Sequence, residues 1–192
     1  NPPKKKLTNK PLKEPKKVII KNNDIITKLP KNSSYNWTEE VIKALEIGYH
    51  SKSGSLVFPI HNSNGQWVNV WLHKPEETFI QKGLKCQLYP LHLIKGYVRE
   101  KPTCVVEGMK DVATLLSYGI QAITGTNGLA IPSDLSPLNH LNEFIVFNDN
   151  DDKGIICQEK WCSSLYSNNR KISYTDWNLI TSKQPHKADV TD

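Results

Sequence analysis

Short apolar runs alternate with segments of helical period through the second half of the chain. The apolar runs predict strands at residues 103–106, 121–124, 143–147 and 171–175. The segments between them predict helices at 110–118, from about 133, and at 153–166, with Gly119 closing the first helix. Repeated strand–helix units favour a parallel sheet with right-handed crossovers, so we expect an α/β fold here.

The first half of the chain shows a different pattern. Thr38 can cap a helix whose apolar positions recur at helical spacing, and Gly48 is expected to end that helix. A hairpin is predicted from the runs 56–60 and 66–72, because the Asn64-Gly65 pair between them tolerates positive φ. Pro59 places the first of these strands at a sheet edge or at a bulge.

The basic charge of the chain is concentrated at its start. Residues 1–31 hold ten Lys and two acids, whereas the whole chain of 192 residues has a net charge of +6. Residues 1–30 are also rich in Pro, which is typical of a linker. A Lys-rich tail of this kind either binds nucleic acid through its charge or is simply solvated.

The chain has no apolar run of the roughly 20 residues that would cross a bilayer, and its Pro/Lys-rich start is not a secretory signal. Because it begins at Asn1 rather than Met, we expect it to be a piece of a longer protein. The four Cys form no C-x-x-C pair and lie at no zinc-finger spacing. These features predict a reducing compartment, no membrane association and no zinc in this fragment.

Two of the predicted strands end abruptly in carboxylates. Glu107 follows the strand 103–106, and Asp149 and Asp151 follow the strand 143–147. Open α/β sheets bind ligands at the carboxyl ends of their strands, and clustered carboxylates repel one another unless cations lie among them. The arrangement therefore predicts a divalent-metal site that acts on phosphates.

The order of these motifs resembles the Toprim domain, the metal-binding catalytic module of DnaG-type primases, some topoisomerases and related nucleases. Its E-G-x-x-D pattern matches residues 107–111, and its D-x-D pattern matches residues 149–151. Gly125-Thr126 matches a G-T pair that is common after the second strand in primases, and residues 187–192 resemble a later acidic segment. The resemblance implies a Rossmann-like parallel sheet flanked by helices over residues 99–192.

The preceding segment is similar to the small subdomain that comes before Toprim in primases of the DnaG and Twinkle-like types, including phage and plasmid primase–helicases. The similarity lies in Ile47-Gly48-Tyr49, Phe58-Pro59-Ile60, Gln81-Lys82-Gly83 and Leu88-Tyr89-Pro90-Leu91. It implies a mixed α+β subdomain over residues 31–98 that contacts template and nucleotide. Residues 69–74 depart from the family, because Asn-Val-Trp-Leu-His-Lys replaces an Arg-bearing G-F-x-G-R pattern.

The resemblance also implies roles for individual residues. Glu107, Asp149 and Asp151 would be catalytic and hold the principal ion, and Asp111 and Asp189 would bind further ions, giving two to three Mg²⁺ or Mn²⁺. The implied contacts to substrate or DNA are Lys74, Lys82, Lys85, Lys110, Gly125 and Thr126.

Several of these residues could instead have a purely structural role. Asp151 or Asp152 could be a plain helix cap, and Asp111 could be a favourable charge in a first helical turn. Residues 125–128 could be a tight turn. Residues 149–160 could be a calcium-binding loop, but Lys153 and Lys160 stand where an EF-hand has two of its ligands.

The function implied by the resemblance is primer synthesis on single-stranded DNA from nucleoside triphosphates, with a replicative helicase as partner. Such a protein would act in the cytoplasm of a bacterial, phage or plasmid host, or in an organelle matrix. The alternatives are a primase-like module that only binds single-stranded DNA or a helicase, and a Toprim nuclease. A topoisomerase is disfavoured, since the chain has no room for a strand-passage body.

Overall fold

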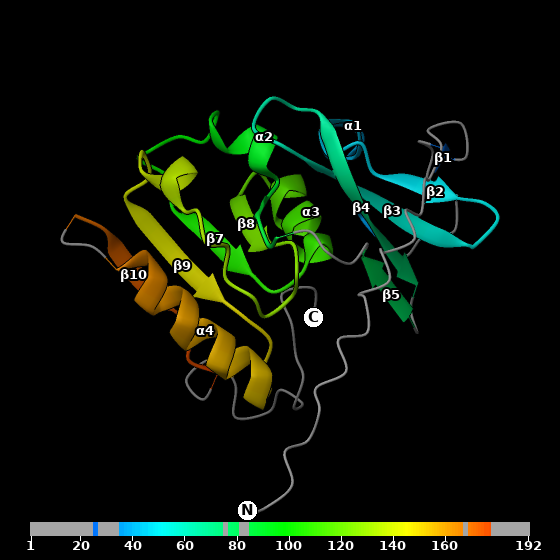
Figure 1. Ribbon diagram of the computed structural model, residues 1–192. Coiled ribbons are helices and arrows are strands. Elements are labelled where there is room, and N and C mark those ends of the chain that lie inside the picture. The colour runs from blue at the N-terminus through cyan, green and yellow to red at the C-terminus, as the bar shows by residue number, and fades with distance from the viewer. Residues whose placement is uncertain (1–24, 27–34, 75–76, 81–84, 167–168, 178–192) are drawn as a thin grey trace, which may run out of the picture.

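The computed structural model describes residues 25–26, 35–74, 77–80, 85–166 and 169–177, with backbone alone for 25–26 and 77–80. The described part of the chain contains two five-stranded sheets with helices packed on them (Figure 1). No helix among these residues is long and apolar enough to cross a membrane.

The first sheet is antiparallel, with strands in the order β1-β2-β3-β4-β5. These strands are β1 (Ile25–Ile26), β2 (Gly48–His50), β3 (Ser55–His61), β4 (Trp67–Lys74) and β5 (Glu77–Ile80). The predicted hairpin is β3–β4, and Gly65 in its turn has φ +77°. Pro59 pairs with Val70 on β4, whereas β2 pairs only as far as Val57, so Pro59 lies at a local edge beside a bulge at Ile60/His61.

The second sheet is mostly parallel, with strands in the order β10-β9-β7-β8-β6. Four strands are parallel: β7 (Thr103–Val106), β8 (Gln121–Gly125), β9 (Glu143–Phe147) and β10 (Lys171–Tyr174). The short β6 (Leu88–Tyr89) pairs antiparallel with β8. Each of the four parallel strands was predicted within one residue at either end, and the α/β class is confirmed.

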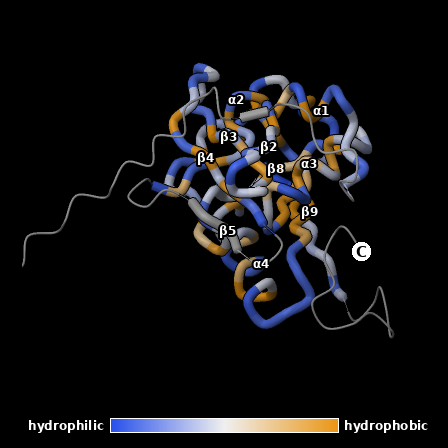
Figure 2. Tube along the Cα trace, turned by 90° about the vertical axis from the view of Figure 1, so that its right-hand side faces the viewer, coloured by the Kyte–Doolittle hydropathy of each residue, from blue (hydrophilic) through white to orange (hydrophobic). Residues whose placement is uncertain are grey.

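Two helices cover opposite faces of this parallel sheet. Alternation along β7 sends Val106 toward α3 (Met109–Ser117) and Val105 toward α4 (Asp152–Leu165). The first sheet and α1 (Glu39–Ala44) pack on the α3 side, so Leu45, Phe58 and Val106 share one core. The hydrophobic segments accordingly gather where β3, β8, β9 and α3 meet (Figure 2).

Two details of the predicted elements are wrong. The helix expected from about residue 133 is only a 3-10 turn at Ser136–Leu138, beside the short α2 (Leu91–Ile94). Gly48 does not end α1 but begins β2, and the chain reverses earlier, at Glu46 with φ +53°. The Glu46 carboxylate accepts from Trp67 Nε1 and lies 3.4 Å from His61 Nε2, so contacts with β3 and β4 hold its side chain.

The loop between β9 and α4 is held tightly against the helix start. Asp151 caps α4, its Oδ1 accepting from the Gly154 backbone N–H at 2.8 Å. Gly154 is buried, and a Cβ at this position would lie 2.1 Å from the backbone oxygen of Asp149. Only glycine therefore lets the helix pack this closely on the loop.

We expect Leu45→Ala to lower the free energy of unfolding by about 2–5 kcal/mol, because the fully buried Leu45 joins α1 to the core shared by both sheets. Urea unfolding followed by circular dichroism and by tryptophan fluorescence should shift as one transition. Val98→Ala is the control, since Val98 is 44% exposed and should cost no more than about 0.5 kcal/mol. Two separate transitions would contradict a shared core.

Gly154→Ala should lower the free energy of unfolding by about 1–3 kcal/mol and displace the Asp149 loop, because the new methyl overlaps backbone rather than a flexible side chain. Thermal unfolding measures the first effect, and amide chemical shifts of residues 148–154 measure the second. Gly96→Ala is the matched control, because its Cβ would meet only an ordinary contact at 3.4 Å. Equal stability of the two variants would refute the close approach.

Candidate metal centre

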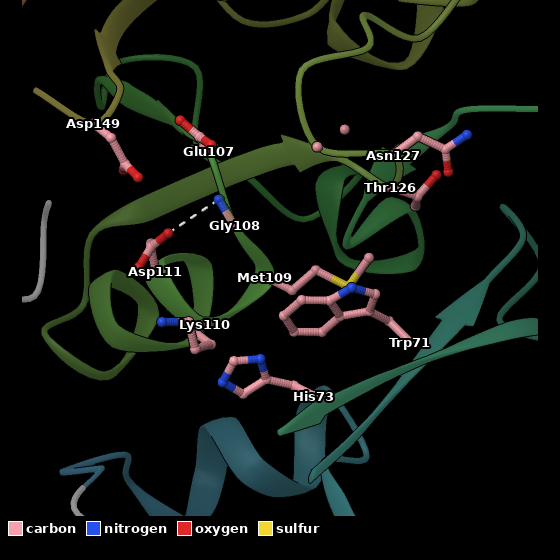
Figure 3. Close-up of a pocket in the computed structure, with 12 residues that line it drawn as sticks. Trp71, His73, Glu107, Gly108, Met109, Lys110, Asp111, Thr126, Asn127 and Asp149 are labelled. Carbon is pink, nitrogen blue, oxygen red and sulfur yellow. Dashed lines mark hydrogen bonds between the residues drawn. The ribbon is translucent and has the colours of Figure 1, made fainter. Parts of the chain in front are cut away.

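The parallel pairing of β7 with β9 brings two carboxylates to the same edge of the second sheet. Val106 is in register with Phe147, so Glu107 and Asp149 both lie just beyond the carboxyl ends of adjacent strands. Figure 3 shows both side chains on one side of the pocket, with Asp111 close to them. This convergence is the one that the sequence predicted for Glu107 and Asp149.

Electrostatic repulsion acts on Glu107 more than on an ordinary surface carboxylate. Burial and the negative charges of Asp149, Asp151 and Asp111, in that order, raise the pKa of Glu107 to about 7. The backbone N–H of Asp149 donates to this carboxylate and offsets part of the effect. Its buried Oε2 has no hydrogen-bond partner among the described residues, so one oxygen remains available to a ligand.

Asp111 and Asp151 both use one carboxylate oxygen within the protein. Asp111 Oδ2 accepts from the Gly108 backbone N–H at 3.0 Å at the start of α3, and Asp151 Oδ1 caps α4. The helix-capping alternative is therefore real for Asp151, and Asp111 does lie in a first helical turn. Asp111 also lines the pocket, whereas Asp151 does not and acts on Glu107 through its charge.

The segment after β8 closes another side of the pocket. Thr124 Oγ1 donates to the backbone oxygen of Glu107 at 2.9 Å and so fixes the start of the acidic loop. Thr126 Oγ1 accepts from the Gln87 N–H at 3.0 Å, which ties this segment to the first half of the chain. Gly125 has no room for a side chain, because a Cβ would lie 2.6 Å from Ala130 O. Gly125 and Thr126 thus shape the pocket wall and have a structural role of their own.

The lysines predicted to contact substrate lie in different places. Lys110 lines the pocket beside Asp111 (Figure 3). Lys85 is exposed and lines an adjoining groove that shares Thr126 and Asn127 with the pocket. Lys74 ends β4 and belongs to neither lining. Lys82 and Asp189 lie outside the described residues.

The pocket has a volume of about 600 Å³, and three lining residues with aromatic or polar side chains were not predicted as site residues. These are Trp71 and His73 on β4, and Asn127 after β8. Burial, and then the charge of Lys110, lower the pKa of His73, so its imidazole is neutral at pH 7. The sequence showed that residues 69–74 depart from the primase pattern, but only the position of β4 places Trp71 and His73 at this wall.

The donor set suits a hard cation, although it is incomplete in the described residues. Among residues 35–74, 85–166 and 169–177, no three acidic, His or Cys side chains stand close enough together to hold a metal ion by themselves. Mg²⁺ commonly takes one or two carboxylates, with waters and substrate phosphates as its other ligands. Glu107 and Asp149 are two carboxylates at one sheet edge, which is the number that such a site needs.

Comparison with known proteins gives structural likeness alone. No protein-family model matches the chain, and no curated protein matches it. A chain of the bacteriophage T7 complex of lagging-strand DNA polymerase with primase domains, an RNA/DNA hybrid and dTTP is similar, with a TM-score of 0.60 and 14% identity. That match covers 80% of this chain and 79% of the T7 chain.

Two bacterial structures are similar as well. The DnaG catalytic core matches with a TM-score of 0.59 and 17% identity, over 72% of this chain and 60% of that one. The Aquifex aeolicus primase, with its zinc-binding and RNA polymerase domains, matches with a TM-score of 0.60 and 16% identity, over 72% of this chain and 46% of that one. The chain thus spans about half to three fifths of the length of these bacterial proteins. Its described part has the mixed α/β fold of primase catalytic cores.

Proposed function

We propose that this chain is the catalytic core of a DNA primase of the DnaG or Twinkle-like type, a nucleotidyltransferase that makes short RNA primers on single-stranded DNA. The observation that carries the proposal is the meeting of Glu107 and Asp149 at the carboxyl ends of adjacent parallel strands, within a fold like that of primase cores. The motifs around these residues support a Toprim domain at 99–192, after a linker at 1–30 and a small subdomain at 31–98.

The state of the Glu107 carboxylate supports the binding of one or more divalent cations. The raised pKa of Glu107 and its unpartnered buried Oε2 both describe a carboxylate that a cation would stabilise. In this proposal Glu107, Asp149 and Asp151 hold the principal Mg²⁺ or Mn²⁺, and Asp111 and Asp189 contribute to further ions. Such ions neutralise phosphate charge and make a hydroxyl nucleophilic when they are bound.

The remaining residues would position the substrate. Lys110 places a cation at the acidic end of the pocket, where it can meet the phosphates of a nucleotide. Gly125 and Thr126 line the same pocket, and Lys85 lies along the adjoining groove, where a nucleic-acid strand could pass. Lys74 and Lys82 complete the proposed basic contacts.

Similar structures suggest the partners. One is a DnaG primase catalytic domain bound to single-stranded DNA, and another is the primase fragment of the bacteriophage T7 primase–helicase protein. By analogy we propose single-stranded DNA, nucleoside triphosphates and a replicative helicase as partners. The cytoplasm of a bacterial, phage or plasmid host, or an organelle matrix, stays a prediction for the location.

One observation favours a second candidate, a primase-like module that binds single-stranded DNA or a helicase without synthesis. The family pattern has an Arg within residues 69–74. In this chain the pocket residues from that segment are Trp71 and His73, and the lowered pKa of His73 leaves its imidazole uncharged. A phosphate contact made by that Arg would be absent. The fold shared with primase catalytic cores favours primer synthesis over binding alone. The convergence of the two carboxylates favours it as well. The Toprim nuclease is a third outcome of the same assay.

The test is synthesis of labelled oligoribonucleotides by the full-length protein on single-stranded templates with Mg²⁺ or Mn²⁺. Glu107→Gln and Asp149→Asn should each lower the rate about 100-fold or more, which corresponds to about 2.7 kcal/mol of transition-state stabilisation. Glu143→Gln is the matched control, because Glu143 begins the same strand β9 and pairs with Lys171 at the opposite end from Asp149.

Two outcomes would contradict the primase proposal, and a third would contradict its assigned catalytic residues. Shortened template would indicate a nuclease, and DNA binding without product would indicate the binding module. Synthesis that survives both acidic substitutions would remove Glu107 and Asp149 from the catalytic site.

A pH dependence follows from the raised pKa of Glu107. Because this pKa is about 7 in the folded protein against an ordinary value of 4.5, the native state holds a proton that the unfolded state lacks between these values. The stability of the metal-free protein should therefore fall as pH rises through that window. Mg²⁺ competes with the proton, so its apparent affinity should fall by up to about tenfold for each pH unit below 7.

Thermal unfolding and calorimetric Mg²⁺ titration between about pH 5.5 and about pH 8.5 measure both effects. Glu107→Gln should remove most of the pH dependence and raise the melting temperature of the metal-free protein at the alkaline end, by about 2–4 °C if screening leaves about 1 kcal/mol. The same pH profile in wild type and variant would show that another group is responsible.

A further inference from the structure

The pocket wall opposite the carboxylates is aromatic. Trp71 and His73 are two residues apart on β4, so their side chains project from the same face of the strand. Their ring centroids are 5.1 Å apart and their planes are inclined by only 14°, which is a stacked arrangement. Figure 3 shows both rings on the far side of the pocket from Glu107 and Asp149.

Neighbouring aromatic side chains hold Trp71 and His73 in place. Phe58 is the cross-strand partner of Trp71, is fully buried, and meets the indole in an edge-to-face contact at 5.1 Å and 63°. Tyr35 lies with its hydroxyl 3.4 Å from His73 Nε2. Trp71 itself is only half-buried and lines the pocket. A large planar side chain is thus fixed by the core on one side and open to a cavity on the other.

Charge is distributed unevenly across the same pocket. The carboxylates of Glu107 and Asp149 follow the strand ends, and Lys110 in α3 lies between Asp111 and His73 (Figure 3). The wall opposite the carboxylates presents an indole and a neutral imidazole. A ligand that fits this pattern has a highly charged end that binds cations and a flat, uncharged end that stacks. A volume of about 600 Å³ lies within the usual range for small-molecule sites.

We infer that Trp71, backed by His73, stacks on the nucleobase of a nucleoside triphosphate whose phosphates lie at the Glu107 and Asp149 end of the pocket. The inference rests on the proposed function, since it names the part of the substrate that this wall recognises. Base stacking on an aromatic side chain is worth about 1–3 kcal/mol and tolerates every base. The contact would therefore hold the nucleotide without selecting its sequence, leaving selection to the template.

The experiment compares two probes that share phosphates but differ in the base. Calorimetry measures the binding of magnesium ATP and of magnesium tripolyphosphate to wild type, Trp71→Ala and Trp71→Phe. Trp71→Ala should weaken ATP binding about tenfold and leave tripolyphosphate binding within about twofold, since only ATP loses a stacked base. Trp71→Phe should retain ATP binding within about threefold, because it keeps an aromatic face.

Trp67→Phe is the matched control, because Trp67 lies on the same strand but packs beside His61, does not line the pocket, and should leave both affinities unchanged. A second readout does not depend on the alanine variant folding. ATP should quench tryptophan fluorescence in wild type and in Trp67→Phe, and this quenching should be lost in Trp71→Phe although that variant still binds ATP.

Three results would overturn the inference. One is an equal loss of ATP and tripolyphosphate binding in Trp71→Ala, which would mean that the indole only supports the fold. The others are unchanged ATP binding in Trp71→Ala and quenching that persists in Trp71→Phe.

Failure here is separable from failure of the proposed function. Primer synthesis that requires Glu107, combined with ATP binding insensitive to Trp71, would refute the stacking wall and keep the primase. Trp71-dependent ATP binding without any synthesis would keep the stacking wall and refute the primase.

Discussion

Repulsion between carboxylates at one sheet edge is the constraint on which the rest of this structure depends. β7 and β9 are adjacent and parallel, so the residues that follow them lie close together at one edge of the sheet. Burial, together with this repulsion, raises the pKa of Glu107 to about 7, and its buried Oε2 has no hydrogen-bond partner among the described residues. A protein keeps so costly an arrangement when a ligand of opposite charge compensates for it. A divalent cation is the simplest ligand that does so.

The surrounding elements hold the acids in place. Hydrogen bonds at the starts of α3 and α4 orient Asp111 and Asp151. Thr124 fixes the backbone of Glu107, and Gly154 lets α4 approach the Asp149 loop. Across the pocket, the first sheet contributes an uncharged aromatic wall. The two sheets therefore supply complementary halves of one cavity, which explains why they share a core.

The sequence predicted the parallel strands and the meeting of Glu107 with Asp149 well, because both follow from local apolar runs and from the rule that parallel strands end at one edge. It failed where tertiary contacts decide the outcome. The chain reverses at Glu46, with φ +53°, and not at Gly48, and the Glu46 carboxylate contacts Trp67 and His61, which are distant in the sequence. Trp71 was not predicted as a site residue, since nothing in the spacing along one strand reveals which cavity that strand faces.

The most direct test of the account is the location of a bound ion in crystals grown with Mn²⁺, by its anomalous scattering. The account predicts a peak within about 2.1–2.3 Å of carboxylate oxygens from both Glu107 and Asp149. That peak should vanish in Glu107→Gln. A peak bound elsewhere on the chain, or none at this edge while the protein is saturated with metal, would contradict the claim that these two carboxylates share a cation.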